Sequence, residues 1–195
     1  YLSLRNLLRE VGACTVCADA LPSGVRPVVQ AAHSARLLII GQAPGRKVHE
    51  TGIPWNDASG ERLRAWTQLD SVDFYDEQRV AILPMGFCYP GTDPTGADRP
   101  PRPECAPLWH SRLLALLPAV QCIVLVGLHA QRRYLGSSRK ATLTETVRTY
   151  REYGPRFFPL PHPSWRSVAW MKKHRWFEET VLPDLRNVVR ASIGR

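Results

Sequence analysis

The sequence predicts an α/β fold, a single domain over residues 1–195 in which a central, mainly parallel four-stranded sheet lies between two layers of helices. Four short apolar runs rich in branched residues have the length and composition of buried strands. Helical patterns lie between and around these runs. Alternating strands and helices are typical of a parallel sheet covered on both faces, which is the three-layer α/β/α arrangement.

The expected strands are 35–41, 80–85, 122–127 and 157–161. The expected helices are 2–11, 60–69, 104–117 and a closing helix over 170–193, which Pro183 can kink. The segment 89–103 is rich in proline and glycine but short, and cysteines bracket it, so we expect an ordered surface loop.

The composition narrows the class of protein and of partner. With 44% hydrophobic residues the chain can bury a substantial core, and no apolar run approaches the roughly 18 residues that cross a bilayer. No stretch has the pattern of a secretory signal, so we expect a cytoplasmic monomer without a membrane partner. The formal net charge of +9 favours polyanions. Charge alone does not separate DNA from RNA or an acidic protein, or from a merely basic surface.

Two motifs follow strands directly, at the edge of a parallel sheet where ligands bind. The run Gly-Gln-Ala-Pro-Gly at 41–45 leads into a polar loop that ends at Trp55, and its glycines let the backbone approach a ligand closely. The second motif fixes His162 between Pro161 and Pro163, which presets the backbone. Taken separately, the first is compatible with an ordinary turn and the second with a structural histidine.

Together the two motifs resemble the paired signature of the uracil-DNA glycosylase superfamily. The Thr-Gly-x-Pro-Trp run at 51–55 and the strand that ends at Gly127 are similar as well, so the resemblance covers about residues 10–190. It is nearest to the iron–sulfur class called family four, whose first motif reads Gly-Glu-Ala-Pro-Gly. The resemblance implies a monofunctional DNA-repair glycosylase that acts on DNA containing uracil or another deaminated base and leaves an abasic site.

The cysteines point to the same class. In a cytosolic chain, five cysteines argue against a disulfide framework and toward metal binding or buried thiols. Cys14, Cys17, Cys88 and Cys105 resemble the family-four ligands of a [4Fe–4S] cluster, which needs four thiolates. A tetrahedral zinc site would use the same residues, and four free thiols are the simplest alternative. Cys122 lies inside an expected strand and is interpreted as a small buried apolar residue.

The resemblance also implies residue roles. His162 would donate a hydrogen bond to the base as negative charge develops on it, and Trp55 would stack on the base. The backbone of the first motif would line the base and the attacking water. The expected base pocket is Gly41, Ala43, Pro44, Gly45 and Trp55, and the expected DNA contacts are Ser164, Trp165, Arg166, Lys172 and Lys173. The two lysines have an equally simple interpretation as a solvated helix face.

Two positions depart from the resemblance. Family four has Glu where this chain has Gln42, which can orient a water but cannot take its proton. The candidates for a substitute are Glu50 and Asp57, with His49 as a further one, although Asp57 could equally cap the following helix. A dissociative reaction could also proceed with a merely positioned water.

The second departure is Pro84, which stands where the family has an Asn that binds the uracil edge. That contact would then come from the backbone near 85–87, and hypoxanthine or xanthine are open as substrates.

Three alternatives compete with a hydrolytic enzyme. A non-hydrolytic, or very slow, uracil-DNA-binding relative would share the pocket, and the missing Glu at position 42 favours it. Covalent capture of the sugar by His162 is disfavoured, because no inserted basic loop follows the first motif. A metal-binding scaffold without a DNA role would leave the paired motifs unexplained. Since neither motif contains a lysine for a Schiff base, we expect no lyase activity.

Overall fold

The computed structural model describes residues 3–194 and contains a four-stranded sheet in the order β2-β1-β3-β4. All neighbouring strands are parallel, with Ile39 opposite Ile82 and Val124. The strands are β1 (Leu37–Ile40), β2 (Val80–Ile82), β3 (Cys122–Val126) and β4 (Phe157–Leu160). Each lies inside one of the four apolar runs, so the predicted sheet is confirmed.

Helices precede, connect and follow the strands. The α-helices are α1 (Leu4–Gly12), α2 (Arg46–Thr51), α3 (Ala58–Thr67), α4 (Ser71–Phe74), α5 (Cys105–Leu114), α6 (Leu128–Leu135), α7 (Leu143–Arg148), α8 (Arg166–Lys173) and α9 (Leu182–Ile193). Short 3₁₀ turns occur at Ala18–Ala20, Gly136–Ser138 and Tyr150–Tyr153, and a π-helical turn at Phe177–Val181 leads into α9.

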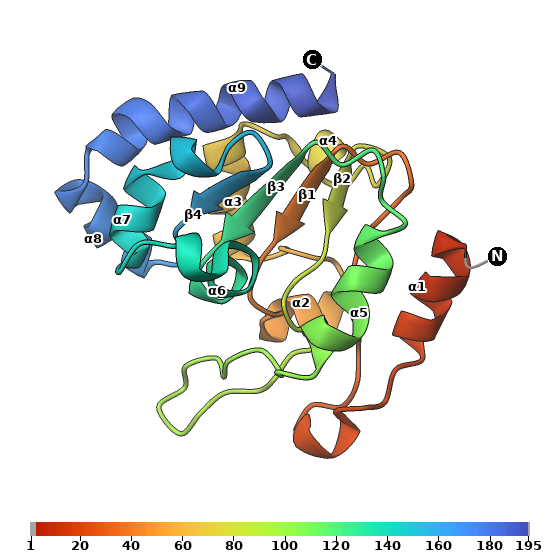
Figure 1. Cartoon of the computed structure of the whole chain (residues 1–195). Helices are drawn as coiled ribbons and strands as arrows, with labels where there is room; N and C mark the ends of the chain where they lie inside the picture. The colour runs from red at the N-terminus through yellow and green to blue at the C-terminus, as the bar shows by residue number, and fades with distance from the viewer. Residues whose placement is uncertain (1–2, 195) are drawn as a thin grey trace.

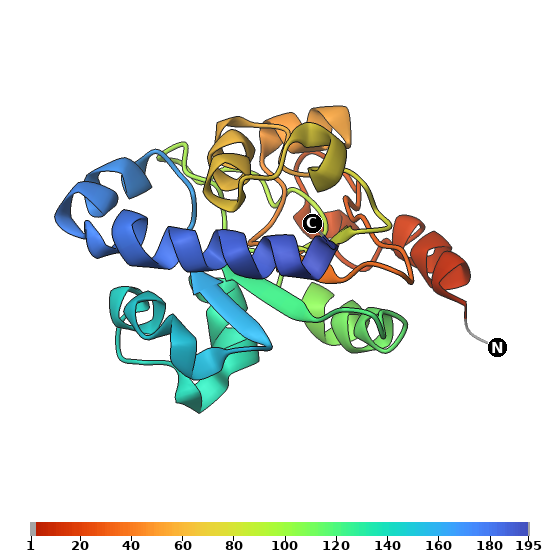
Figure 2. The ribbon, with the colours of Figure 1, turned by 90° about the horizontal axis from the view of Figure 1, so that it is seen from above.

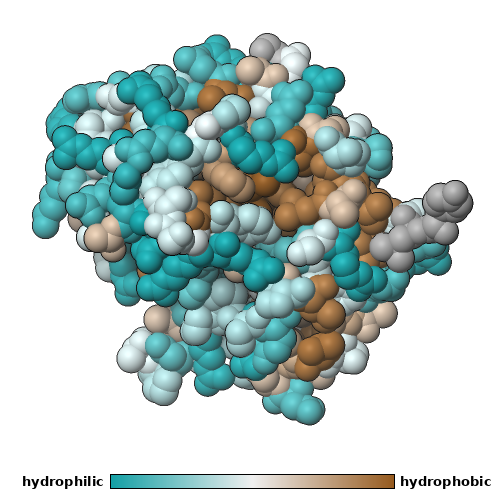
Figure 3. Space-filling view, viewed as in Figure 1, coloured by the Kyte–Doolittle hydropathy of each residue, from teal (hydrophilic) through white to brown (hydrophobic). Residues whose placement is uncertain are grey.

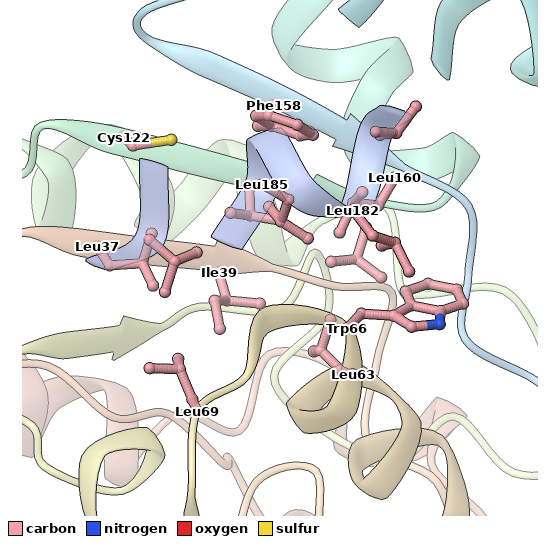
Figure 4. Close-up of a cluster of buried hydrophobic side chains, with 14 of the residues drawn as sticks. Leu37, Ile39, Leu63, Trp66, Leu69, Cys122, Phe158, Leu160, Leu182 and Leu185 are labelled. Atoms are coloured by element: carbon pink, nitrogen blue, oxygen red, sulfur yellow. The ribbon is translucent and has the colours of Figure 1, made fainter. Parts of the chain in front are cut away.

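The side chains of β1 alternate between two cores, one on each face of the sheet. Leu37 and Ile39 pack with residues of α3 and α9, as Figure 4 shows for Leu63 and Leu185. Leu38 and Ile40 face the opposite core, to which α1, α5 and α6 contribute. The two views of the ribbon show the same three layers (Figures 1 and 2). The α/β/α architecture predicted from the sequence is therefore confirmed.

Two predicted segments differ from the structure. The stretch after the first motif is not a loop throughout, because α2 forms between Gly45 and Gly52, and Gly52 ends it in a left-handed conformation. The closing segment is not one helix kinked at Pro183. It breaks at His174, whose backbone is non-helical, while Pro183 lies in the first turn of α9. The π-helical turn leads directly into this position, since the Leu182 N–H bonds to the Phe177 carbonyl, and Pro183 follows it as a residue with no N–H to donate.

The carboxyl ends of the strands point toward the lower part of Figure 1, where α2 and the 89–103 segment lie. This segment is ordered by its own hydrogen bonds, as predicted. The Asp93 carboxylate accepts from the backbone N–H groups of Thr95 and Ala97, and the Arg99 N–H donates to the Gly91 carbonyl at 2.9 Å. Between residues 3 and 194, no helix is long and apolar enough to span a membrane.

Candidate active site

A pocket opens at the carboxyl edge of the sheet and encloses about 530 Å³ of space, part of it open to solvent. Gln42 follows β1 and His162 follows β4, and both line this pocket, although 120 positions of sequence separate them. The structure therefore brings the two motifs together. Other lining residues are Gly41, Ala43, Pro44, Gly45, Trp55, Asp57, Ser59, Pro84 and Asp98.

Trp55 is held against the pocket by its backbone and by two glycines. Its φ of 56° lies in the left-handed region, where a bulky side chain is rare. A Cβ at Gly60 would lie 1.7 Å from the Trp55 carbonyl oxygen, and one at Gly41 would lie 2.6 Å from the indole ring. Arg64 donates to the same carbonyl at 3.1 Å. Such backbone strain persists only where the surroundings fix it, and it is concentrated at functional sites.

His162 faces Trp55, with their ring centroids 5.9 Å apart. Burial lowers the pKa of His162, and the Asp57 carboxylate opposes this shift more weakly. The imidazole is therefore neutral at pH 7. Within residues 3–194, no side chain or backbone group forms a hydrogen bond to the ring, so its N–H is available to a ligand.

The turn that carries His162 is tied to α3. The Arg62 guanidinium donates to the Pro163 carbonyl at 2.7 Å, and a Cβ added to Gly127 would lie 3.6 Å from the His162 Cβ. The helix α3 therefore supports both walls of the pocket, because Gly60 and Arg64 contact Trp55 from the same helix.

Two carboxylates flank Gly45 inside the pocket. The Asp57 Oδ2 and the Asp98 Oδ2 lie 3.8 Å and 3.6 Å from the point that a Cβ on Gly45 would occupy. Asp57 uses Oδ1 to accept the Gly60 N–H at 2.8 Å, so it caps α3 and keeps Oδ2 for the pocket. Asp98 stands at the exposed rim, where partial desolvation and then the Asp57 charge raise the pKa of its carboxyl. Sequence reasoning found Asp57 and missed Asp98.

The other candidate bases lie outside the pocket. Glu50 is exposed on α2 and does not line it. The His49 Nε2 lies 3.1 Å from the Ser23 carbonyl oxygen, to which it donates, and the ring packs near Tyr89. The backbone carbonyls of both residues accept hydrogen bonds from Arg26. The structure therefore brings Asp57 into the pocket and places Glu50 and His49 outside it.

The backbone N–H groups of 85–87 are not available to a base, contrary to expectation. The Met85 N–H donates to the Gly41 carbonyl and the Gly86 N–H to the Gln42 carbonyl, both at 2.9 Å. The Phe87 N–H donates to the Cys105 sulfur at 3.3 Å. The first two bonds extend the parallel pairing of β1 and β2 past the strand ends, which consumes the donors.

A wider groove continues from the pocket and shares Gln42 and His162 with it. Ser164, Trp165 and Arg166 line this groove as expected, and the 74% exposed Trp165 carries the Arg166 guanidinium over its ring. Arg62 and Arg99 are further cations of the groove that sequence reasoning missed. Lys172 and Lys173 are exposed on α8 but do not line it. The groove therefore offers guanidinium groups and one exposed indole beside the pocket.

A family model described as the uracil DNA glycosylase superfamily matches residues 28–186. This stretch contains the whole pocket and the groove. The chain belongs to the uracil DNA glycosylase superfamily. Membership in the superfamily supports a glycosylase-type function on DNA and explains why the paired motifs meet at one edge of the sheet.

A second hollow, distinct from the base pocket, is lined in part by Gly86, Phe87 and Cys88. Cys14, Cys17, Cys88 and Cys105 all line it, together with apolar side chains that include the exposed Val16 and Leu108. Figure 3 shows apolar surface over α5 and the neighbouring N-terminal segment. Cys122 is buried in the core of the sheet, away from this hollow, as predicted.

The donor set of the hollow fits a polynuclear cluster. The Cys105 sulfur accepts a hydrogen bond from the Phe87 backbone N–H, and such bonds stabilise thiolate ligands. Burial raises the pKa of Cys105 to about 12 in the metal-free protein, so thiolates there need a positive partner. In the described part of the chain, no three Cys, His, Asp or Glu side chains form a group that could hold a metal ion, so the four thiols share the hollow without converging on one point.

Proposed function

We propose that the protein is a monofunctional DNA glycosylase that flips uracil, or another deaminated base, out of DNA and hydrolyses its N-glycosidic bond. The observation that carries the proposal is the convergence of Trp55, Asp57 and His162 in one pocket that opens into a cationic groove. A base inside a duplex is inaccessible, so a pocket beside the groove is where an extruded nucleotide would lie.

His162 stabilises the departing base. Cleavage leaves negative charge on the base, and a fixed hydrogen-bond donor stabilises that charge more in the transition state than in the ground state. Because burial keeps the imidazole neutral at pH 7, one ring nitrogen carries the N–H that donates, and no positive charge has to be desolvated in the pocket. Trp55 holds the base by stacking, with its ring fixed against Gly41.

Asp57 acts on the sugar side of the bond. Its Oδ2 faces the pocket while Oδ1 accepts the Gly60 N–H at the N-terminus of α3. An ionised carboxylate there can accept the proton of the attacking water and offset the positive charge that develops on the sugar. This supplies the carboxylate that Gln42 lacks and favours an enzyme over a non-hydrolytic binder.

Trp165 and the arginines serve the DNA outside the pocket. An exposed indole beside the pocket mouth can take the place of the extruded base in the stack, and guanidinium groups hold phosphates. No lysine of residues 3–194 lines the pocket or the groove, so the proposal includes no Schiff-base lyase step.

The proposal includes a [4Fe–4S] cluster held by Cys14, Cys17, Cys88 and Cys105. When bound, the cluster would act as a structural crosslink between the N-terminal segment and the loop that lines the groove. Protein purified without oxygen should be brown and contain iron and acid-labile sulfide. Cys105→Ser should lose both, and Cys122→Ala, the matched control from the core, should retain them. Zinc in place of iron, or colourless metal-free protein, would exclude the cluster.

The excision claim is tested with a panel of oligonucleotides that carry uracil, hypoxanthine, xanthine or undamaged bases. We expect release of the free damaged base and an alkali-labile abasic site, with no strand cleavage before alkali. Tight binding of uracil-containing DNA without base release would instead identify a non-hydrolytic relative. Release of no base together with no lesion-dependent binding would contradict the proposal.

A further inference from the structure

The wall of the base pocket at 84–86 has few polar groups left for a ligand. Pro84 has no N–H, and its carbonyl accepts from the His110 Nε2 at 2.9 Å. The Met85 and Gly86 N–H groups are bonded to the carbonyls of Gly41 and Gln42. The segment 84–86 therefore offers no free N–H donor to the base edge, and the side chains that line the pocket are the next source of donors.

Few lining side chains have uncommitted polar atoms, and Gln42 is the one best matched to a base. Its amide forms no hydrogen bond with any group of residues 3–194, and it lines both the pocket and the groove. Its backbone carbonyl accepts the Gly86 N–H, which anchors Gln42 directly beside the wall formed by 84–86. Ser59 and Asp98 are the other side-chain candidates, and Asp98 stands at the rim.

The chemistry of an amide separates these candidates. A glutamine amide presents a donor and an acceptor in one plane, whereas an ionised carboxylate only accepts and a hydroxyl has a single donor. Deaminated bases expose a lactam edge, a C=O next to an N–H, which an amide matches with two hydrogen bonds. An unbonded amide at the pocket mouth is therefore complementary to uracil, hypoxanthine and xanthine alike.

We propose that Gln42 is the specificity residue of the pocket and binds the lactam edge of the extruded base through its side-chain amide. This inference rests on the proposed glycosylase function and assigns the substrate class of the same site. It also separates two roles, since Gln42 then contacts the base and Asp57 contacts the water. The amide distinguishes uracil and hypoxanthine from cytosine and adenine, which lack a lactam edge. Thymine and guanine carry the same edge, so the other walls of the pocket have to exclude them.

The test removes the Gln42 amide from the enzyme and the lactam edge from the substrate. Single-turnover excision is measured for uracil and for pyrimidin-2-one, which lacks both the O4 and the N3 hydrogen. The wild-type protein should prefer uracil, and Gln42→Leu should reduce the uracil-to-pyrimidinone rate ratio by about tenfold or more, the usual worth of a lost hydrogen bond to a buried group. Ser59→Ala tests the rival hydroxyl, and Gln78→Leu, the matched control from the exposed surface outside the pocket, should leave the ratio unchanged. An unchanged ratio in Gln42→Leu would overturn the inference, as would a ratio that falls only in Ser59→Ala.

Gln42→Glu separates base recognition from water activation. A carboxylate cannot donate to the base carbonyl, so we expect slower excision of uracil and hypoxanthine at pH 8. Faster excision of every base would instead show that position 42 acts on the water. A binding experiment repeats the comparison in an Asp57→Asn background. It measures the dissociation constants of uracil-containing and pyrimidinone-containing DNA, and these do not require hydrolysis. If the wild type released no base, these constants would still decide the role of Gln42, while the glycosylase proposal alone would fail.

Discussion

The base pocket and the cysteine hollow are both lined by one short segment, 84–88, in which Pro84 lines the pocket and Gly86, Phe87 and Cys88 line the hollow. The two sites use their polar groups in opposite ways. In the pocket, three polar groups have no hydrogen-bond partner among residues 3–194. They are the His162 imidazole, the Gln42 amide and one oxygen of Asp57. In the hollow, the thiols lie among apolar side chains, and the Phe87 backbone N–H already donates to the Cys105 sulfur.

This difference separates a site for turnover from a site for permanent binding. A catalytic pocket keeps donors and acceptors unsatisfied, because they must bond to a substrate that comes and goes. A permanently bound cofactor does not exchange, so the protein can keep hydrogen-bond donors directed at its ligands in the folded state. The segment between the two sites is fixed from behind by His110, which bonds to Pro84 and stacks on Phe87.

The largest effect is expected from Asp57→Asn. Asparagine keeps the cap of α3 but cannot accept the water proton, so single-turnover excision should fall by about 10²- to 10⁴-fold. The melting temperature should change little. Asp70→Asn is the matched control, because Asp70 caps α4 outside the pocket, and it should leave excision unchanged. A small rate loss in Asp57→Asn would show that another residue activates the water.

His162→Ala should come next, with a loss of about 10²- to 10³-fold in single-turnover rate, the usual effect of removing one donor to a developing anion. The measurement is made across pH. Because burial lowers the pKa of His162, the wild-type rate should persist below pH 6.5 and fall only when the folded-state imidazole becomes protonated. Rates that instead increase as the imidazole becomes charged would contradict a neutral donor.

His110 should make the free energy of unfolding fall in acid, without a direct effect on the excision rate. Burial lowers the pKa of His110 to about 4, below its unfolded value near 6.5, so the unfolded chain binds the proton first as pH falls. The wild type should therefore lose about 3 kcal/mol of unfolding free energy from this group between pH 7 and pH 4. In His110→Gln, denaturant titrations should show a shallower decline with acid. Equal slopes for both proteins would show that His110 is not responsible.

Trp55→Ala should have a smaller effect, about 1–3 kcal/mol of lost binding for the extruded base. The affinity for lesion-containing DNA should drop by that amount, while the affinity for undamaged DNA of the same sequence should not. Trp165→Ala serves as the contrast, because its ring lies in the groove and should affect both DNAs. Equal losses on both DNAs in Trp55→Ala would place the indole outside the base site.

The sequence predicted those parts of the molecule that depend on local patterns. Short branched runs identified all four strands, and strand-to-loop placement brought Gln42 and His162 to one edge. Helix α2 was missed because its six residues are too few to show a helical period. The break at His174 was missed because apolar side chains continue on both sides of it.

The remaining site residues depend on contacts between distant segments. Arg62 meets Pro163 across 101 positions, and no local pattern signals that contact. Asp98 reaches the pocket only through the fold of the 89–103 loop. The backbone near 85–87 was predicted to contact the base, but the Met85 and Gly86 N–H groups bond to the Gly41 and Gln42 carbonyls past the strand ends. The register of two strands decides how far their hydrogen bonding continues, and a single sequence does not show that register.

The account depends on a single nucleobase lying between Trp55 and His162. The most direct measurement is a nitrogen-15 spectrum of the histidine rings, taken with and without DNA that carries a non-hydrolysable 2′-fluorinated deoxyuridine, with His162 assigned from the His162→Ala variant. We predict that bound DNA shifts the His162 signals while the ring stays neutral and carries one N–H. Saturating binding that leaves the His162 signals unmoved would contradict the account.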